Sequence, residues 1–234
     1  MSDFRTQEAS CPACGETVRV EVLDGVRAED HPEVREALLA GRLGAATCSC
    51  GAETRVWVPC VYTDFEHGTY VALAGPVPDW RALVPTHAKV FDEALTLGPP
   101  FARSIGARLK HRLVLDPLAL REKVLLFEAN LDDRVVEALK GAWLKKQGRG
   151  PADELLRVSA VLEGGHLLLA RWQPGAVRGE GPWVMERPTL LGHVTLTADR
   201  YQKRWMRRDA TSLWPALAHP WMVDLYVASS GVST

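Results

Sequence analysis

Four cysteines in two closely spaced pairs constrain the fold of this chain more than any other feature. The first pair lies in Cys-Pro-Ala-Cys-Gly at residues 11–15, and the second in Cys-Ser-Cys-Gly at residues 48–51. Zn²⁺ takes four tetrahedral ligands in structural sites, and thiolates are common among them. Two cysteines one or two positions apart can aim both sulfurs at one point from a tight turn. The glycine that follows lets the backbone bend without a Cβ clash. The pattern therefore predicts a structural zinc site.

The predicted ligands are Cys11, Cys14, Cys48 and Cys50. Zn²⁺ is the expected cofactor, and four thiolates leave no open position for a catalytic water. Cys60 is expected outside the site, because a strand predicted over residues 53–58 would carry it more than about 15 Å away at roughly 3.3 Å per residue. His31 is an alternative ligand, but a capping role at a helix start is available to it. A redox pair and thiols that bind no metal remain alternatives.

Several segments of the chain are similar to the bacterial CpXC family, which is named for two Cys-Pro-x-Cys motifs. The similar segments are the first cysteine motif, the strand at 18–22, the helix at 30–39, and residues 120–124 and 131–137. Together they cover roughly residues 8–146. The second motif departs from the family pattern, since it lacks the proline and is one residue shorter. The resemblance implies membership of this family. It does not indicate a particular activity, because the family has no assigned activity.

Composition indicates an ordinary globular protein. The chain has 234 residues, of which 47% are hydrophobic and 24% charged, so one large or two small domains are expected. The N-terminal residues form no apolar secretory segment, and no apolar run approaches the roughly 20 residues of a membrane span. We therefore expect a cytoplasmic protein with no membrane partner, in which paired cysteines bind metal rather than form disulfides.

Local patterns predict an N-terminal module with the arrangement of a zinc ribbon. Alternation at residues 17–22 predicts a strand, and a helix is expected over residues 31–43, between the two cysteine motifs. Strands predicted at 53–58 and 69–73 are expected to pair with each other. The result would be a small antiparallel sheet with two metal-bearing turns and an inserted helix. A helix at 86–97 and a break at Gly98 would end this module.

A helical hairpin is predicted next. After a strand at 108–115, Asp116 and Pro117 open a helix that runs to about residue 128. Asn130 is expected to cap a second helix, whose basic end, including Lys140, matches the helix dipole. The apolar face of this second helix should pack against a core. Its members are Leu131, Val135, Val136, Leu139 and Trp143.

The C-terminal region has a different pattern. Two apolar runs flank Glu-Gly-Gly at residues 163–165 and predict a β-hairpin over 156–172. A strand is expected at 190–197, a short basic helix at 199–208, and an apolar segment of unassigned type at 221–228. The fold class is therefore α+β in three parts: a zinc-ribbon-like module at 1–100, a strand and helical hairpin at 101–150, and an α+β region at 151–234.

No credible catalytic set is present in the sequence. The chain has no phosphate-binding glycine loop, no nucleophile elbow and no His-Glu-x-x-His helix. Asp64, Glu66 and His67 lie together and could act in acid–base chemistry or bind a metal. A polar turn between two strands is the simpler interpretation. We therefore predict a protein that is not an enzyme.

The charge distribution gives two alternatives for a partner. Residues 1–100 hold 8 basic and 15 acidic side chains, whereas residues 101–234 hold 20 and 14. Basic segments at 103–112 and 200–208 are compatible with nucleic acid, but a pI of about 6.7 does not favour it. The leading hypothesis is a zinc-stabilised protein that binds an unidentified protein partner. A nucleic-acid or ribosome-associated factor is the alternative, and a redox-sensing zinc switch or chaperone the third.

Overall fold

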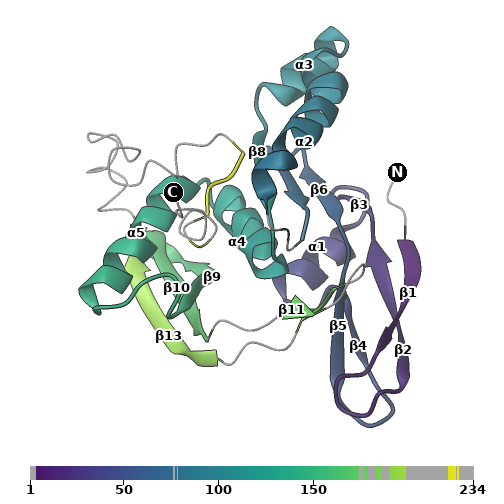
Figure 1. Cartoon of the computed structure of the whole chain (residues 1–234). Coiled ribbons are helices and arrows are strands. Elements are labelled where there is room, and N and C mark those ends of the chain that lie inside the picture. Colours follow the sequence, from purple (N-terminus) through teal and green to yellow (C-terminus); the bar gives the residue numbers. More distant parts are fainter. Residues whose placement is uncertain are drawn as a thin grey trace. The chain divides into compact units, whose positions relative to one another are not determined.

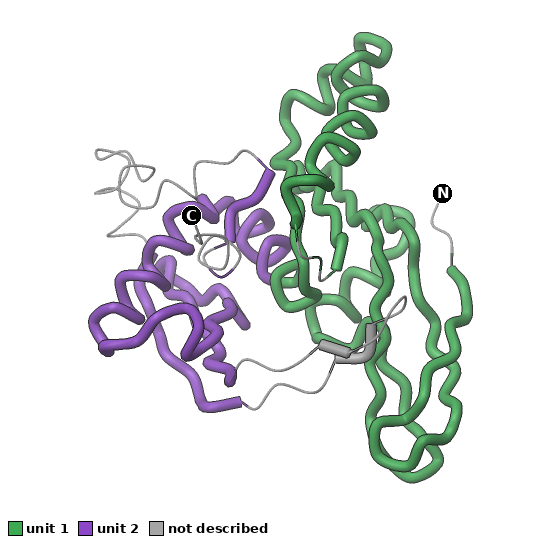
Figure 2. Tube along the Cα trace, in the orientation of Figure 1, with its two compact units in different colours: residues 1–121, 176–187 green, residues 122–175, 188–234 purple. Residues whose placement is uncertain are grey.

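The structure is a computed structural model that describes residues 4–75, 77, 79–173, 177–178, 183–185, 190–198, 221–224 and 226. The expected mixed α+β class is confirmed. The chain forms two compact units, residues 1–121 with 176–187 and residues 122–175 with 188–234 (Figure 2). The boundaries expected near residues 100 and 150 fall inside these units. The helix expected at 199–208 lies outside the described residues, as do residues 225, 227 and 228 of the segment at 221–228.

The N-terminal part of the first unit contains two β-hairpins (Figure 1). The turn of each hairpin contains one cysteine pair. Strands β1 (Phe4–Ser10) and β2 (Thr17–Leu23) form the first hairpin, and β4 (Ala45–Thr47) and β5 (Glu53–Trp57) the second. The alternation of β2 turns Val18, Val20 and Val22 inward. These valines form one buried cluster with Val56, Val58 and the first cysteine of each pair, so the two hairpins share a core.

A helix lies between the two hairpins in sequence. Helix α1 (Pro32–Leu39) begins at the predicted position but ends four residues before residue 43. Gly41 has a φ of +68°, the left-handed conformation that commonly closes a helix. His31 occupies the N-cap position without a side-chain capping bond. Its Nδ1 lies 3.0 Å from Glu33 Oε1 instead, so the capping role expected for His31 is not observed.

The second sheet of this unit has the strand order β3-β6-β7-β8. Its strands are β3 (Gly25–Arg27), β6 (Cys60–Asp64), β7 (Thr69–Leu73) and β8 (Lys110–Val114). The central pair β6–β7 is antiparallel, and the two outer pairs are parallel.

The predicted pairing of residues 69–73 with residues 53–58 is wrong. β7 pairs with β6 and β8, whereas β5 pairs with β4 and with β12 (Trp183–Met185), which in turn pairs with β11 (Val177–Arg178). Pro59 has no N–H to donate to a ladder, which favours a break between β5 and β6. The sequence prediction did not recognise β6 as a strand of its own.

An arm of helices follows β7 in the sequence. It contains η1 (Trp80–Ala82), α2 (Val84–Phe91), the π-helical turn η2 (Asp92–Thr96) and α3 (Pro100–Gly106), shown in Figure 1. A Cβ added at Gly106 would lie 2.9 Å from Leu95 Cβ, so this glycine lets α3 approach η2 closely. The helix predicted at 86–97 therefore exists, and it is one half of a helical hairpin.

The second unit combines a three-stranded sheet with helix α5 (Asp133–Lys146) and most of α4 (Pro117–Glu128), which begins in the first unit. The sheet order is β13-β10-β9, formed by β9 (Leu155–Leu162), β10 (His166–Trp172) and β13 (Leu190–Thr197). The hairpin predicted around residues 163–165 and the strand at 190–197 are confirmed. Every pair in this sheet is antiparallel.

The termini of α4 and α5 show which predicted caps are correct. Asp116 Oδ1 accepts a hydrogen bond of 2.7 Å from the Ala119 amide, as expected for an N-cap. The cap of α5 is Asp132, which accepts from the Arg134 amide at 2.9 Å. The prediction of Asn130 as that cap is wrong, because Asn130 lies beyond the end of α4 with a φ of +52°. Asparagine tolerates this left-handed conformation better than most residues.

Candidate metal centre

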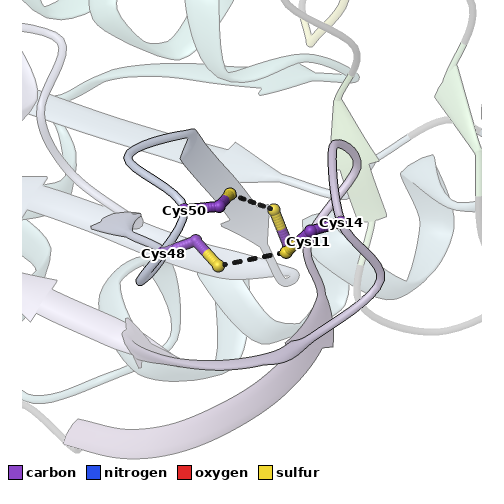
Figure 3. Close-up of side chains that lie close together, drawn as sticks. All are labelled: Cys11, Cys14, Cys48 and Cys50. Carbon is purple, nitrogen blue, oxygen red and sulfur yellow. Dashed lines mark hydrogen bonds between the residues drawn. The ribbon is translucent and has the colours of Figure 1, made fainter.

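The structure brings the four predicted cysteine ligands together (Figure 3). Cys11 Sγ lies 3.7 Å from Cys50 Sγ, and Cys14 Sγ lies 3.5 Å from Cys48 Sγ. All four sulfurs lie within 4.8 Å of one another. Both short contacts connect one turn with the other, so each hairpin supplies two sulfurs to a common centre. A tetrahedron with metal–sulfur bonds of about 2.3 Å has sulfur–sulfur edges of about 3.8 Å, and the observed spacing fits it.

The two turns close in the same way despite their different lengths. In the first, the Cys11 amide donates to the Glu16 carbonyl at 2.8 Å. In the second, the Cys48 amide donates to the Ala52 carbonyl, also at 2.8 Å. The second turn is one residue shorter, as its motif is. The shorter motif is therefore accommodated by a tighter turn that still directs both sulfurs to the centre.

Glycine follows each cysteine pair for a conformational reason. Gly15 has a φ of +78° and Gly51 a φ of +83°. A Cβ added at either position would have no heavy atom within 4 Å among the described residues. Contacts with other segments of the chain therefore do not require glycine at these positions. What the turns require is the left-handed backbone conformation that glycine adopts at low cost.

Burial differs between the two members of each pair. Cys11 and Cys48 are buried within the valine cluster of the two hairpins, whereas Cys14 and Cys50 are exposed. Hydrogen bonds from the backbone of Cys14 and Ala13 lower the pKa of Cys11 to about 6. A backbone hydrogen bond at Glu16 lowers the pKa of Cys14, but the adjacent thiols of Cys50 and Cys48 raise it further, to about 12. Four thiols this close cannot all ionise easily, and a bound dication would offset their repulsion.

The two other residues considered as ligands, Cys60 and His31, are not part of the group formed by the four cysteines. Cys60 lies on β6 and is 9% exposed. Burial raises the pKa of its thiol to about 12, and the negative charge of Asp24 adds to the effect. A protonated thiol is a poor metal ligand, since thiolates are the form that binds.

Sequence reasoning missed one polar contact between the two turns. Ser49 Oγ donates a hydrogen bond to Glu16 Oε2, and the same carboxylate oxygen lies 3.9 Å from Cys48 Sγ. Glu16 directly follows Gly15, and Ser49 is the middle residue of the second motif. Their contact links the first turn to the second without using a cysteine. The only feature of the sequence that indicates this contact is the position of Glu16 directly after the first motif.

Comparison with known proteins places the chain in a family. The CpXC protein family matches residues 9–140, which is more than half of the chain, and the chain therefore belongs to this family. The match covers both cysteine motifs. No curated protein and no solved structure matches the chain. Within the described residues, the helices are too short or too polar to cross a membrane.

Proposed function

We propose that Cys11, Cys14, Cys48 and Cys50 bind one Zn²⁺, and that the ion stabilises a zinc-ribbon-like module in a non-enzymatic protein that acts by binding another protein. The observation that supports the metal is the group of four sulfurs within 4.8 Å of one another. A tetrahedral set of four thiolates suits Zn²⁺ or an iron–sulfur centre, and it leaves no position for a substrate. A reducing cytoplasm is the compartment that keeps such thiols available to a metal.

The proposed role of the ion is structural. Cys11 and Cys48 are part of the buried cluster that joins the two hairpins, so a metal bound there would tie both turns to that core. Structural zinc commonly supplies part of the folding free energy of a small domain. The two cysteine turns would then be ordered only in the loaded protein.

Elemental analysis of protein purified without added metal tests this proposal. We expect about one zinc per chain, and Cys50→Ser should lose it. Cys60→Ser is the matched control, because Cys60 lies outside the four-sulfur group, and it should keep the zinc. Zinc near zero in the wild type, or loss of zinc in Cys60→Ser alone, would contradict the proposal. Release of zinc by low concentrations of peroxide would instead favour the redox alternative.

Exposed apolar side chains on the helical arm support the proposal that the protein binds a protein partner. Leu97 and Phe101 are 75% and 77% exposed, and Val90 is 53% exposed. Leu97 and Phe101 lie on either side of the bend between η2 and α3. Large apolar side chains grouped on a surface commonly mark an interaction site.

A pull-down from native cytosol tests whether the arm is the surface that binds the partner. It compares the wild type with the Leu97→Ser/Phe101→Ser variant. We expect the double variant to lose a partner that the wild type captures. The matched control is Leu190→Ser/Leu191→Ser, which removes two similarly apolar but less exposed side chains from β13. Equal capture by the Leu97→Ser/Phe101→Ser variant would exclude the arm as the binding surface.

The structure offers less support for the nucleic-acid alternative. The basic segment at 103–112 is not one exposed stripe, because Arg112 is buried within β8. Few phosphates could therefore be neutralised by this segment. A gel-shift series at physiological salt distinguishes the two hypotheses, and sub-micromolar binding to RNA or DNA would reverse their order.

A further inference from the structure

Glu16 ends the first cysteine turn and makes three separate contacts there. Its carbonyl oxygen accepts the Cys11 amide at 2.8 Å, which closes the turn. Its own amide forms a hydrogen bond with the sulfur of Cys14. Its carboxylate accepts a hydrogen bond from Ser49 of the second turn. One residue therefore connects both cysteines of the first turn with the second turn.

The contact between Ser49 and Glu16 lies directly beside the group of four sulfurs. The two residues are 33 positions apart in the sequence. Ser49 Oγ lies 3.8 Å from Cys48 Sγ, and Glu16 Oε2 lies 3.9 Å from the same sulfur. The contact therefore links the two halves of the metal centre in Figure 3 and occupies no ligand position.

The second motif needs such a contact more than the first motif does. The first turn contains Pro12, whose ring fixes φ and stiffens the backbone. The second turn has no proline, is one residue shorter, and leaves Cys50 exposed. It has Ser49 instead, and the side chain of Ser49 is anchored on the first hairpin. The residue at which the chain departs from the family motif is therefore the one that makes the contact.

We propose that Ser49 and Glu16 form a clasp beside the metal centre, and that this clasp slows the release of Zn²⁺ by holding the two cysteine turns together. Both are positioning residues, since neither binds the ion. The inference rests on the proposed zinc site and adds which residues set the lifetime of the bound ion. Groups that hydrogen-bond around the ligands of a metal commonly change its affinity by about tenfold or more.

The two turns must separate before the ion can leave, because each turn supplies two of the four sulfurs. Cys11 and Cys48 are held in the valine cluster, whereas Cys50 is exposed and is free to detach first. Ser49 directly precedes Cys50 in the chain. While the hydroxyl of Ser49 stays bonded to Glu16, Cys50 remains close to the centre and can bind again. Without the clasp, the second turn can move away from the first.

The charge of Glu16 is a second property that acts on the ion, and variants separate it from the hydrogen bond. A carboxylate attracts the dication and repels the thiolates around it. Glu16→Gln removes the charge but keeps an oxygen that can accept the hydroxyl of Ser49. Ser49→Ala removes the hydrogen bond but keeps the charge. A clasp predicts faster release in Ser49→Ala than in Glu16→Gln, and a charge effect predicts the opposite.

The rate of zinc release from the loaded full-length protein into an excess of a chromophoric chelator tests the proposal. We expect release to be about threefold to tenfold faster in Ser49→Ala and in Glu16→Ala than in the wild type, the range that corresponds to one hydrogen bond. Glu16→Gln should release zinc at nearly the wild-type rate. The double variant Ser49→Ala/Glu16→Ala should be no faster than either single variant, because each change already breaks the contact.

Glu8→Ala is the matched control. Glu8 is also an exposed glutamate of the first hairpin, but its Oε1 lies 3.1 Å from Arg19 Nε within that hairpin, so its loss should leave the release rate unchanged. Circular dichroism and the Tm would verify that each variant folds. A wild type that holds no zinc would contradict both the zinc site and the clasp. Zinc that is held by the wild type but released as fast as from Ser49→Ala, or equal acceleration in Glu16→Gln and Glu16→Ala, would overturn the clasp alone.

Discussion

Lys140 Nζ lies 2.5 Å from Glu122 Oε1, and neither side chain of this ion pair is exposed to solvent. The pair joins α5 to α4, and Glu122 Oε2 also accepts the backbone amide of Val158 in β9. Lys140 makes a second contact of 3.1 Å with Glu137. Burial of a charge is costly unless it is paired and hydrogen-bonded, and this network meets both conditions.

Lys140→Met should destabilise the second unit by about 3–5 kcal/mol, because it leaves two buried carboxylates without the cation that they share. Methionine has a similar length, so the loss would reflect charge more than packing. Lys146→Met is the control, since Lys146 is exposed near the end of the same helix, and it should change stability by less than about 0.5 kcal/mol. Denaturant unfolding measures both. Equal midpoints for the two variants would show that the pair contributes nothing.

Lys140 also shows where sequence reasoning stops. The sequence places Lys140 toward the end of its helix, where its charge matches the helix dipole, and no local pattern indicates a buried partner for it. Its burial depends on Glu122, which lies 18 positions earlier in the chain. The partners of Lys123 are likewise distant from it in the sequence. Its Nζ lies 3.1 Å from both Asp133 and Glu137. No local pattern encodes such pairs.

The features that could be predicted are those encoded within a few residues. The spacing of the cysteines predicted the group of four sulfurs, and alternation predicted β2. Asp116 with Pro117 predicted the start of α4. The partners of β5 and β7 could not be obtained in this way, because strand pairing depends on long-range contacts. The contact of Glu29 with the turn after β6 could not be predicted for the same reason, since its Oε1 accepts the amide of Phe65, 36 residues further along the chain.

Glu154 should make the stability of the second unit depend on pH. Its side chain is fully buried, and Arg171 and Arg149 both form ion pairs with it. The hydrogen bond from Arg171 is the main reason that the pKa of Glu154 is lowered from 4.5, with burial opposing it and Arg149 adding to it. A lowered folded-state pKa gives stability that is complete above the unfolded value and is lost as the pH falls through the folded value.

Glu154→Gln removes this contribution while it keeps the shape of the side chain. The free energy of unfolding of the wild type should therefore exceed that of the variant most at neutral pH. The difference should narrow as the pH falls below about 4.5, the value of the unfolded chain. Urea titrations at several pH values between about 7 and 2 measure it. A difference that is constant with pH would contradict the assigned pKa shift.

Gly51 and Gly44 should respond differently to substitution. Gly51→Ala should cost about 1–2 kcal/mol, because its φ of +83° is unfavourable for alanine although space is open. Gly51→Asn should recover part of this loss, since asparagine tolerates the left-handed region. At Gly44 a Cβ would lie 2.4 Å from the Val56 carbonyl oxygen, so Gly44→Ala should cost more and Gly44→Asn should not recover it. The Tm of each of the four variants, measured by thermal unfolding with metal present, tests these expected differences in stability.

Cys60 should be nearly inert toward alkylation in the native protein. Its pKa of about 12 leaves about one thiolate in ten thousand at pH 8, and its side chain is buried on β6. Cys50 is exposed, so a chelator should make it react while Cys60 stays protected. Mass spectrometry of protein treated with iodoacetamide at pH 8 reports each site. Cys60 should react only after the protein is unfolded in denaturant, and labelling at the rate of a free cysteine in the native state would contradict its assigned burial.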